Sequence, residues 1–568
     1  MSNTSEEQLH VGQRADAGPR EPARRGLRGS PGWTLVAAAL GVMMVALDGT
    51  IVSVANPAIQ AHLHASLADI QWVTNSYLLA LAVTLITVGK VGDRFGHKKV
   101  FLTGIVGFAL TSAAIGLSGD IAKSITMMIV FRVLQGVFGA MLQPTALALL
   151  RNTFPVSKLN NAIGVWGAVL GASTAAGPIV GGLLVQDINW ESCFYVNVPV
   201  GIVALVVGLL VVKETPTSGA AKSFDIPGIA LLSAFLFLLV WALIKGGDYG
   251  WGSGKTIGFF AAAVVAVALF ILRESKTREP LLPLRLFRSV SLSAGTVLVL
   301  CLMFAMYGAM FFMTFFMENA HGLDPIMTGV RLLPMTGMMI IGAPLSGLII
   351  TKVGPKIPMF AGMLMAAAAL YGLSRIGMAS SLNDTIVWFL LLGLGLSPVM
   401  VGATEVIVGN AEVELAGVAG GLQSTALQVG GTIGTSVLGA VLSAKISGLL
   451  PGKLAGVTAK VKAAAAAQAK AMAAHGVHAA PGASAHAFTG FSGAQVAQLK
   501  EAASVATTLP VAKGPQGQVT MMVNDVLHST FISGMQSAFL VAAVVAVVGA
   551  LLALLTKKGA AEGHAPML

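Results

Sequence analysis

The fold is decided by a stretch that closes the second apolar segment of the chain, Gly89-Lys90-Val91-Gly92-Asp93-Arg94-Phe95-Gly96-His97-Lys98. A later stretch repeats its pattern, Gly347-Leu348-Ile349-Ile350-Thr351-Lys352-Val353-Gly354-Pro355-Lys356. A glycine, a base, a second glycine and a lysine fall at matching positions, and each stretch closes the second apolar segment of its half. The repeat predicts two six-helix bundles related by an axis along the membrane normal.

The composition indicates a polytopic membrane protein. The chain has 568 residues, of which 55% are hydrophobic and 10% are charged, whereas soluble domains carry about 25% charged residues. The mean hydropathy is +0.82. The net charge of +11 is explained by bases that flank membrane spans, so we predict no nucleic-acid partner. The two cysteines, Cys193 and Cys301, are expected to be packing residues without a disulfide.

Fourteen apolar segments are long enough to cross a bilayer as helices. Six come first, near residues 33–55, 72–92, 100–118, 125–150, 161–185 and 194–213. Two follow, near 226–245 and 256–272. Six close the chain, near 291–317, 327–350, 357–378, 385–408, 417–443 and 529–556. The expected fold is therefore all-α, with two six-helix bundles and two extra central helices.

Lysine and arginine set the orientation of these spans. One set of connections is rich in bases, among them Arg94, Lys98, Lys99, Arg151, Lys158, Lys213, Lys222, Arg273, Lys276, Arg278, Arg285, Arg288, Lys352, Lys356, Lys557 and Lys558. The opposite short loops contain only Lys123, Lys245, Lys255 and Arg375. The positive-inside rule then places both termini in the cytoplasm. We expect a multi-pass protein of the plasma membrane.

The domain organisation follows from the spans. Residues 1–32 form a basic cytoplasmic arm expected to be disordered, with no signal peptide, and residues 33–213 form the first bundle. Residues 214–290 link the bundles and contain the two extra helices. The second bundle, 291–556, includes a long extracytoplasmic segment, 446–526, and a tail follows at 557–568.

The long segment is rich in alanine, which predicts helix interrupted near Pro481-Gly482 and Pro510. We interpret it as a solvated hairpin. The alternative is a metal-binding or pH-sensing role for His475, His478 and His486.

One acid stands within the first span. Asp48 lies in an apolar run, where a carboxylate near the middle of a bilayer costs roughly 2.5–3.5 kcal/mol on insertion scales. Proton or cation handling is the first hypothesis for such a residue. In span four, one polar and small helical face contains Arg132, Gln135, Gly136, Gly139 and Gln143. An intramembrane arginine needs an acceptor, and Asp48 is the expected partner of Arg132.

Together these motifs resemble the fourteen-helix drug:H⁺ antiporter group of the major facilitator superfamily, from about residue 30 to 445 and again in the last span. The resemblance implies a cytoplasmic latch between the bundles, made by Gly89, Asp93, Arg94, Gly96 and Lys98. It also implies an antiporter motif in span five, made by Gly164, Ser173, Gly177, Pro178, Gly181 and Gly182, with Ser173 where the family has glycine. The family further ties Arg132 to proton coupling. The alternatives are a charged topology-setting loop, ordinary close packing in span five, and an arginine that reaches the interface.

The opening segment resembles the group's pattern Leu-Asp-x-Thr-Ile-Val-Asn-Val-Ala-Leu-Pro, with departures at Ser53 and Asn56. The resemblance implies a substrate cavity between the bundles. We expect it to be lined by Asn56, Asn75, Tyr77, Gln135, Gln143, Trp166 and Phe316. Two acids in the second half, Glu318 and Glu405, are either further proton-coupling sites or headgroup-level residues in water.

The resemblance implies a proton-driven antiporter. ATP-driven transport is not expected, because the sequence contains no P-loop pattern Gly-x4-Gly-Lys-Ser/Thr. The expected partners are protons, the lipid bilayer and a lipophilic or cationic small molecule, such as a drug or antibiotic. We expect a monomer without metal or cofactor, driven by the proton motive force. The alternatives are an exporter of a lipid or an endogenous amphiphilic metabolite, and a proton-coupled uptake carrier. An enzyme is not expected, because the sequence shows no nucleophile, metal cluster or dinucleotide fingerprint.

Overall fold

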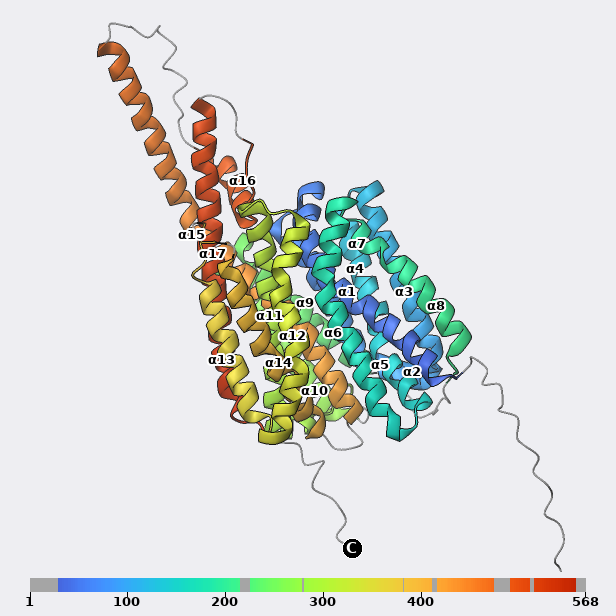
Figure 1. Ribbon diagram of the computed structural model, residues 1–568. Coiled ribbons are helices and arrows are strands. Elements are labelled where there is room, and N and C mark those ends of the chain that lie inside the picture. The colour runs from blue at the N-terminus through green and yellow to red at the C-terminus, as the bar shows by residue number, and fades with distance from the viewer. Residues whose placement is uncertain are drawn as a thin grey trace, which may run out of the picture.

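The computed structural model describes residues 29–214, 225–277, 280–378, 380–381, 383–410, 416–474, 491–510 and 515–557. Every regular element in these ranges is helical (Figure 1). Most of the predicted N-terminal arm, the histidines His475, His478 and His486, and the tail after Lys557 lie outside the described residues.

The first bundle runs from the start of the described chain to residue 211. Its helices are α1 (Pro31–Leu63), α2 (Leu67–Phe95), α3 (His97–Leu117), the π-helix η1 (Ser118–Ala122), α4 (Ile125–Ala140), α5 (Leu142–Thr153), α6 (Val156–Asp187), α7 (Ser192–Tyr195) and α8 (Asn197–Val211). Local sequence fixes several of their ends. Ser66 and Asp69 form a capping box at the start of α2, which satisfies backbone N–H groups that a helix start leaves without partners.

Two helices follow the first bundle, α9 (Ile226–Tyr249) and α10 (Gly254–Lys276). They pack against each other, and α9 also packs against α2 of the first bundle and α15 of the second. Three aromatic rings join α9 to α2, because the ring centroids of Trp72, Phe237 and Trp241 lie 5.6 Å from one another. Helix α9 therefore covers one seam between the bundles, and α10 packs against α9.

The second bundle contains the remaining elements. They are the 3-10 helix η2 (Leu284–Arg288), α11 (Val290–Phe315), the π-helix η3 (Phe316–Ala320), α12 (Pro325–Val353), α13 (Lys356–Leu373), α14 (Asp384–Gly409), α15 (Ala416–Ala474), α16 (Gly493–Ser504) and α17 (Pro515–Ala553). Helix α11 is central, since nearly all of its side chains are buried.

All fourteen predicted apolar segments lie in these helices, and the all-helical polytopic fold is confirmed. In the described ranges, 12 helices are long and apolar enough to cross a membrane, or 13 if the two bent parts of α6 form one span. The remaining predicted segment, 72–92, lies within α2, which has 29 residues. Its polar side chains, among them Gln71 and Asn75, face other helices and are buried.

Span four is not one continuous helix as expected. It divides at Met141 into α4 and α5. Pro144 follows three residues later, and a proline has no N–H to donate to the carbonyl four residues before it. Gln143 lies after the break, on α5, whereas Arg132, Gln135, Gly136 and Gly139 lie on α4.

Helix α15 is longer than the expected span, because it continues without interruption through Pro451 to Ala474. Figure 1 shows α15 and α17 projecting beyond one end of the bundles. We call this the far end, and the end where the described chain starts and stops the near end. The interpretation of the inserted segment as a solvated hairpin is wrong for its later part, since Val505 and Ala506 are 0% exposed.

The reason is that the residues after α16 bind to the second bundle. The Asn319 side chain donates to the carbonyl of Val505 at 2.6 Å, and the Asn524 side chain exchanges hydrogen bonds with Leu509 at 2.8 and 2.9 Å. Helix α16 also reaches the first bundle, because Glu501 accepts a hydrogen bond from the backbone N–H of Leu67 at 2.9 Å.

The bundles touch tightly at the far end. A Cβ atom added at Gly182 of α6 would lie 2.5 Å from the carbonyl oxygen of Pro325, and one added at Gly329 of α12 would overlap the carbonyl of Pro178. The α2–α15 seam is hydrogen-bonded there, from the Gln71 side chain to the carbonyl of Thr435 at 2.9 Å.

Helices α6 and α12 are less closely packed toward the near end. Gly167 and Gly171 lie in the part of α6 toward the near end, and Gly337 and Gly347 lie in the part of α12 toward the near end. A Cβ added at any of these four positions would meet nothing within 4 Å. The two helices thus touch at the far end and leave space toward the near end.

We predict that Gly329→Ala destabilises the protein. The new methyl group would overlap a backbone carbonyl that cannot move without displacing α6, and such overpacking costs about 1–3 kcal/mol. The matched control is Gly337→Ala on the same helix, where a Cβ would meet nothing within 4 Å. The melting temperature of the purified protein in detergent should fall for Gly329→Ala only. If the two variants have the same melting temperature, the tight contact between Gly329 and the Pro178 carbonyl is contradicted.

Candidate functional site: a buried ion pair beside an interbundle cavity

Asp48 is buried in α1 at 0% exposure, and Arg132 of α4 is 1% exposed. The Arg132 Nη1 atom donates to Asp48 Oδ2 at 2.6 Å. Both charges lie inside the helix bundle, where an unpaired charge is strongly unfavourable. Each side chain can therefore be buried as a charge only because the other one neutralises it.

Three further polar groups complete this pair. Gln135 donates from Nε2 to Asp48 Oδ1 at 3.0 Å and accepts from Arg132 Nη1 at 2.6 Å. The Arg132 Nε atom donates to the carbonyl of Val73 in α2 at 3.1 Å. The guanidinium also lies 4.2 Å from the ring centroid of Tyr77, an arrangement that favours a cation. Three helices of the first bundle, α1, α2 and α4, thus meet at one charge pair.

A side branch extends from Asp48 toward α3 and α7. Asn197, at the start of α8, donates to Asp48 Oδ1 at 3.4 Å and to Ser112 Oγ at 3.0 Å. Ser112 in turn donates to the carbonyl of Phe194 at 2.8 Å. Sequence reasoning missed Asn197 and Ser112. The available signal was an isolated amide at the start of an apolar span, which is unfavourable in lipid unless it has a partner.

Span five packs directly against the helix that contains Asp48. A Cβ at Gly181 would lie 2.9 Å from the Ile51 carbonyl oxygen, and one at Gly177 would overlap Thr50. The Thr50 hydroxyl donates to the carbonyl of Thr174 at 3.0 Å. Ser173 is buried and donates to its own helix at Val169, so a hydroxyl is accommodated where the motif has glycine. Gly164 lies in the same helix, α6.

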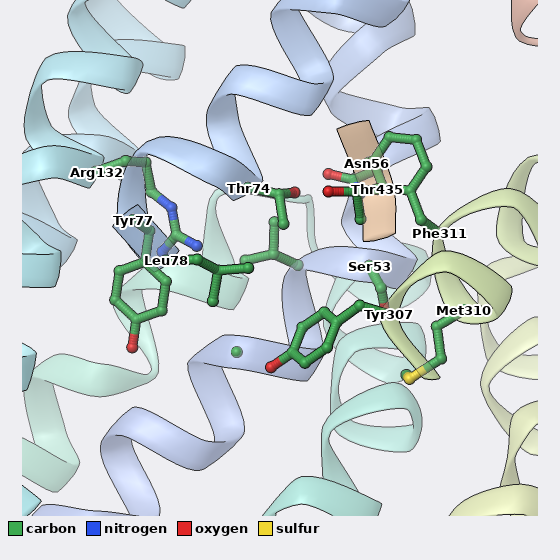
Figure 2. Close-up of a pocket in the computed structure, with 12 residues that line it drawn as sticks. Ser53, Asn56, Thr74, Tyr77, Leu78, Arg132, Tyr307, Met310, Phe311 and Thr435 are labelled. Atoms are coloured by element: carbon green, nitrogen blue, oxygen red, sulfur yellow. The ribbon is translucent and has the colours of Figure 1, made fainter. Parts of the chain in front are cut away.

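A narrow cavity lies next to the ion pair, between the two bundles. Its volume is about 10 Å³, room for about one water molecule. The first bundle contributes Gly49, Val52, Ser53, Asn56, Thr74, Tyr77, Leu78 and Arg132, and the second contributes Tyr307, Met310, Phe311 and Thr435. Figure 2 shows Tyr307 reaching from the second bundle toward α1. Its hydroxyl would lie 3.3 Å from a Cβ at Gly49, the neighbour of Asp48.

Comparison with known proteins agrees with this arrangement. Residues 38–435 match the family model described as Major Facilitator Superfamily. The chain belongs to the major facilitator superfamily. It is a secondary transporter rather than an enzyme.

Members of the superfamily with high similarity are resistance and export proteins. The tetracenomycin C resistance and export protein of Streptomyces glaucescens is 54% identical over 95% of this chain and 94% of its own length. The multidrug resistance protein Stp of Mycobacterium tuberculosis is 36% identical over 72% of this chain and 75% of its own. A crystal structure of a bacterial homologue of the human lysosomal transporter Spinster, inward-facing and occupied, has the same fold. Its TM-score is 0.57 at 16% identity, over 92% of this chain and 96% of that one.

Only some of the residues that the sequence predicts in the cavity of this superfamily member lie in its lining. Asn56 and Tyr77 line the cavity. Gln135 instead binds the ion pair, and Asn75 lies in the seam, where it bonds to Ser436 at 3.0 Å and Thr435 at 2.7 Å. Trp166, Phe316 and Gln143 lie outside the cavity lining: Trp166 and Phe316 pack within the bundles, and Gln143 follows the break in α5. The sequence did not single out Tyr307, which faces the cavity from an otherwise apolar span.

The predicted latch loop binds its own bundle in this structure. Gly96 adopts a φ of +96° at the turn between α2 and α3, a conformation that favours glycine. The backbone N–H of Lys98 donates to Glu214 at 3.0 Å, and its Nζ donates to the carbonyl of Leu209 at 3.2 Å. Arg94 is exposed, and the side chains at Gly89 and Asp93 lie outside what the structure describes. These contacts agree with the open near end, and a latch between bundles stays a prediction.

The two acids of the second half lie far from Asp48 along the chain and in other elements. Glu318 is in the π-helix η3 at the far end, and its Oε1 atom has no hydrogen-bond partner among the described residues. Glu405 lies four residues before the end of α14. Neither lines the cavity, so a proton-coupling role for them stays a prediction.

We predict that Arg132→Met destabilises the protein strongly. It leaves the Asp48 carboxylate buried without its cation, and removal of one partner of a buried pair costs about 3–5 kcal/mol. Adding Asp48→Asn should recover most of that loss, because the second change removes the unpaired charge. Thermal stability in detergent measures both effects.

The control is Arg151→Met, since Arg151 is exposed at the end of α5 and an exposed change of this kind alters stability by less than about 0.5 kcal/mol. If the double variant is as unstable as Arg132→Met alone, the two charges do not compensate each other.

Proposed function

We propose that this protein exports a small-molecule antibiotic in exchange for protons, with Asp48 as the proton carrier. The observation that carries the proposal is the Asp48–Arg132 pair at 2.6 Å, buried beside a cavity between two bundles. The export role is supported by the 54% identity to a tetracenomycin C resistance and export protein. Tetracenomycin C is therefore the first substrate to test.

The proposed orientation places the near end in the cytoplasm of the plasma membrane. Lys98, Arg151, Lys352 and Lys557 belong to near-end connections or helix ends, and such bases accumulate on the cytoplasmic side. The opening between α6 and α12 then faces the cytoplasm, from which an exported compound must be collected. The closed far end faces the exterior, where the proton concentration is higher in a respiring cell.

The proposed coupling between proton movement and export follows because a proton and Arg132 compete for the Asp48 carboxylate. With Asp48 ionised, Arg132 pairs with it. With Asp48 protonated, Arg132 keeps the Gln135 and Val73 acceptors but loses its counter-charge. The guanidinium also lines the cavity, so the proton changes the charge that a bound substrate meets. One charge that crosses through about 100 mV supplies roughly 2.3 kcal/mol, enough for a concentration ratio of several tens.

The contact between Tyr307 and the backbone at Gly49 gives a mechanical link in the same place. A substrate that displaces Tyr307 of the second bundle acts on α1 one residue from Asp48. Because α1 also packs against Gly177 and Gly181 of α6, α1 and α6 would move as one unit against the second bundle. This is the rigid-body alternation expected for two repeated bundles.

We predict that Asp48→Asn abolishes proton-driven accumulation of tetracenomycin C in everted membrane vesicles. The amide retains the shape of the carboxylate but cannot release a proton at physiological pH. The control is Asp187→Asn, an exposed acid at the end of α6, which should transport like the unchanged protein. Comparable amounts of each protein in the vesicles should be confirmed by immunoblotting.

If the Asp48→Asn protein still concentrates tetracenomycin C in a manner abolished by an uncoupler, Asp48 is not the proton carrier. If the unchanged protein accumulates the compound only in right-side-out vesicles, the protein is an uptake carrier and the proposed direction is wrong.

A further inference from the structure

The cavity has no net negative charge in either protonation state of Asp48. Arg132 is the only charged residue among those that line it, and the described structure places the Asp48 carboxylate behind it at 2.6 Å. With Asp48 ionised, the pair is neutral. With Asp48 protonated, the guanidinium charge stands alone. A cationic ligand would thus meet either no counter-charge or a repelling one.

The hydrogen-bonding capacity of the lining is concentrated at Asn56. This side chain is 1% exposed, and neither its Oδ1 nor its Nδ2 atom bonds to any residue in the described ranges. A buried polar group without a partner is unfavourable, because it has given up its hydrogen bonds to water. A hydrogen-bonding group in the cavity, from a water molecule or from a ligand that displaces it, would restore those bonds.

Thr74 of α2 faces the same cavity, and its hydroxyl also lacks a partner among the described residues. Figure 2 shows the Asn56 amide and the Thr74 hydroxyl together on the first-bundle side. The Tyr77 hydroxyl, from the same helix as Thr74, also lacks a partner among the described residues. Two other polar groups of the lining are already bonded. Ser53, one turn before Asn56, donates to the Thr50 carbonyl at 2.6 Å, and Thr435 donates to Asn75 at 2.7 Å.

The opposite wall of the cavity is largely apolar. It consists of Tyr307, Met310 and Phe311 from α11 of the second bundle, together with Thr435 of α15. Aromatic and thioether side chains accommodate planar ligands of varied outline. The cavity as it stands has room for about one water molecule, so a larger ligand would enter only when α11 moves away from α1. It would then place its polar edge on the first bundle and its apolar face on the second.

We propose that Asn56 and Thr74 form a subsite for an uncharged ligand whose flat apolar body presents a hydrogen-bond donor and an acceptor side by side, as a carboxamide does. This inference deepens the proposed function and rests on it for the claim that the cavity takes the exported compound. It narrows the expected substrate from lipophilic or cationic compounds to neutral ones. It also gives a role to Asn56, which occupies the position of a leucine in the antiporter pattern that the opening segment resembles.

Binding of three related probes to the purified protein in detergent tests the subsite. The probes are 2-naphthamide, its N,N-dimethyl amide, which retains the acceptor but lacks the donors, and the 2-naphthyltrimethylammonium cation. We expect 2-naphthamide to bind about tenfold more tightly than the dimethyl amide, since each lost hydrogen bond is worth about 0.5–1.5 kcal/mol. The cation should bind more weakly than either. This comparison needs no variant and so does not depend on the folding of one.

Two substitutions assign the selectivity to Asn56. Asn56→Leu, which retains the branching at Cγ without polar atoms, should weaken 2-naphthamide binding about tenfold and leave the dimethyl amide within about twofold. The matched control is Ser53→Ala on the same face of the cavity, which removes a hydroxyl already bonded to its own helix and should leave the preference for 2-naphthamide unchanged. Asn56→Asp should raise the affinity for the cation, because it adds the carboxylate that the lining lacks.

The proposal is overturned if 2-naphthamide does not bind up to its solubility limit, or if the cation binds the unchanged protein as tightly as 2-naphthamide. It is also overturned if Asn56→Leu weakens all three probes equally, since that would show a packing role. These measurements use no gradient, so they are independent of proton-driven accumulation in vesicles. Loss of that accumulation with retained probe selectivity would contradict the proposed function and not the subsite.

Discussion

The ion pair between Asp48 and Arg132 is the interaction on which the interior of this protein depends. A carboxylate and a guanidinium at 0% and 1% exposure are tolerable in a membrane protein only because each neutralises the other and because Gln135, Asn197 and the Val73 carbonyl satisfy the remaining atoms. The partners come from α1, α2, α4 and α8. The pair therefore fixes the relative positions of these helices more tightly than apolar contacts in lipid could.

Helix α1 brings the remaining features into contact with that pair. On one side it packs against the glycines of α6, and on another it lines the cavity with Asn56, two turns beyond Asp48. Tyr307 then connects the second bundle to the same helix at Gly49. A proton at Asp48 and a ligand at Asn56 would thus act on one rigid element, which is a physical basis for coupling that needs no long-range pathway.

The parts of the chain that distinguish it from a plain pair of six-helix bundles lie away from this centre. Helix α9 covers the seam between α2 and α15 through Trp72, Phe237 and Trp241. Helix α16 spans the far end, and its Glu501 contacts the start of α2. Both additions connect the first bundle to the second, and both do so on the side that is closed in this structure.

The sequence by itself determined where the helices lie, how the halves repeat and which intramembrane charges need partners, because hydropathy, capping and the energetic penalty of a charge in lipid are local properties of the chain. It identified Asp48 and Arg132 for that reason, and Asn56 as a departure from the pattern that the opening segment resembles. Only the tertiary structure decided that Asn197, Ser112 and the Val73 carbonyl complete the pair, that Tyr307 reaches Gly49, and that residues after α16 bind the second bundle. Those contacts join helices distant in sequence, and their geometry depends on how whole helices pack rather than on any local pattern.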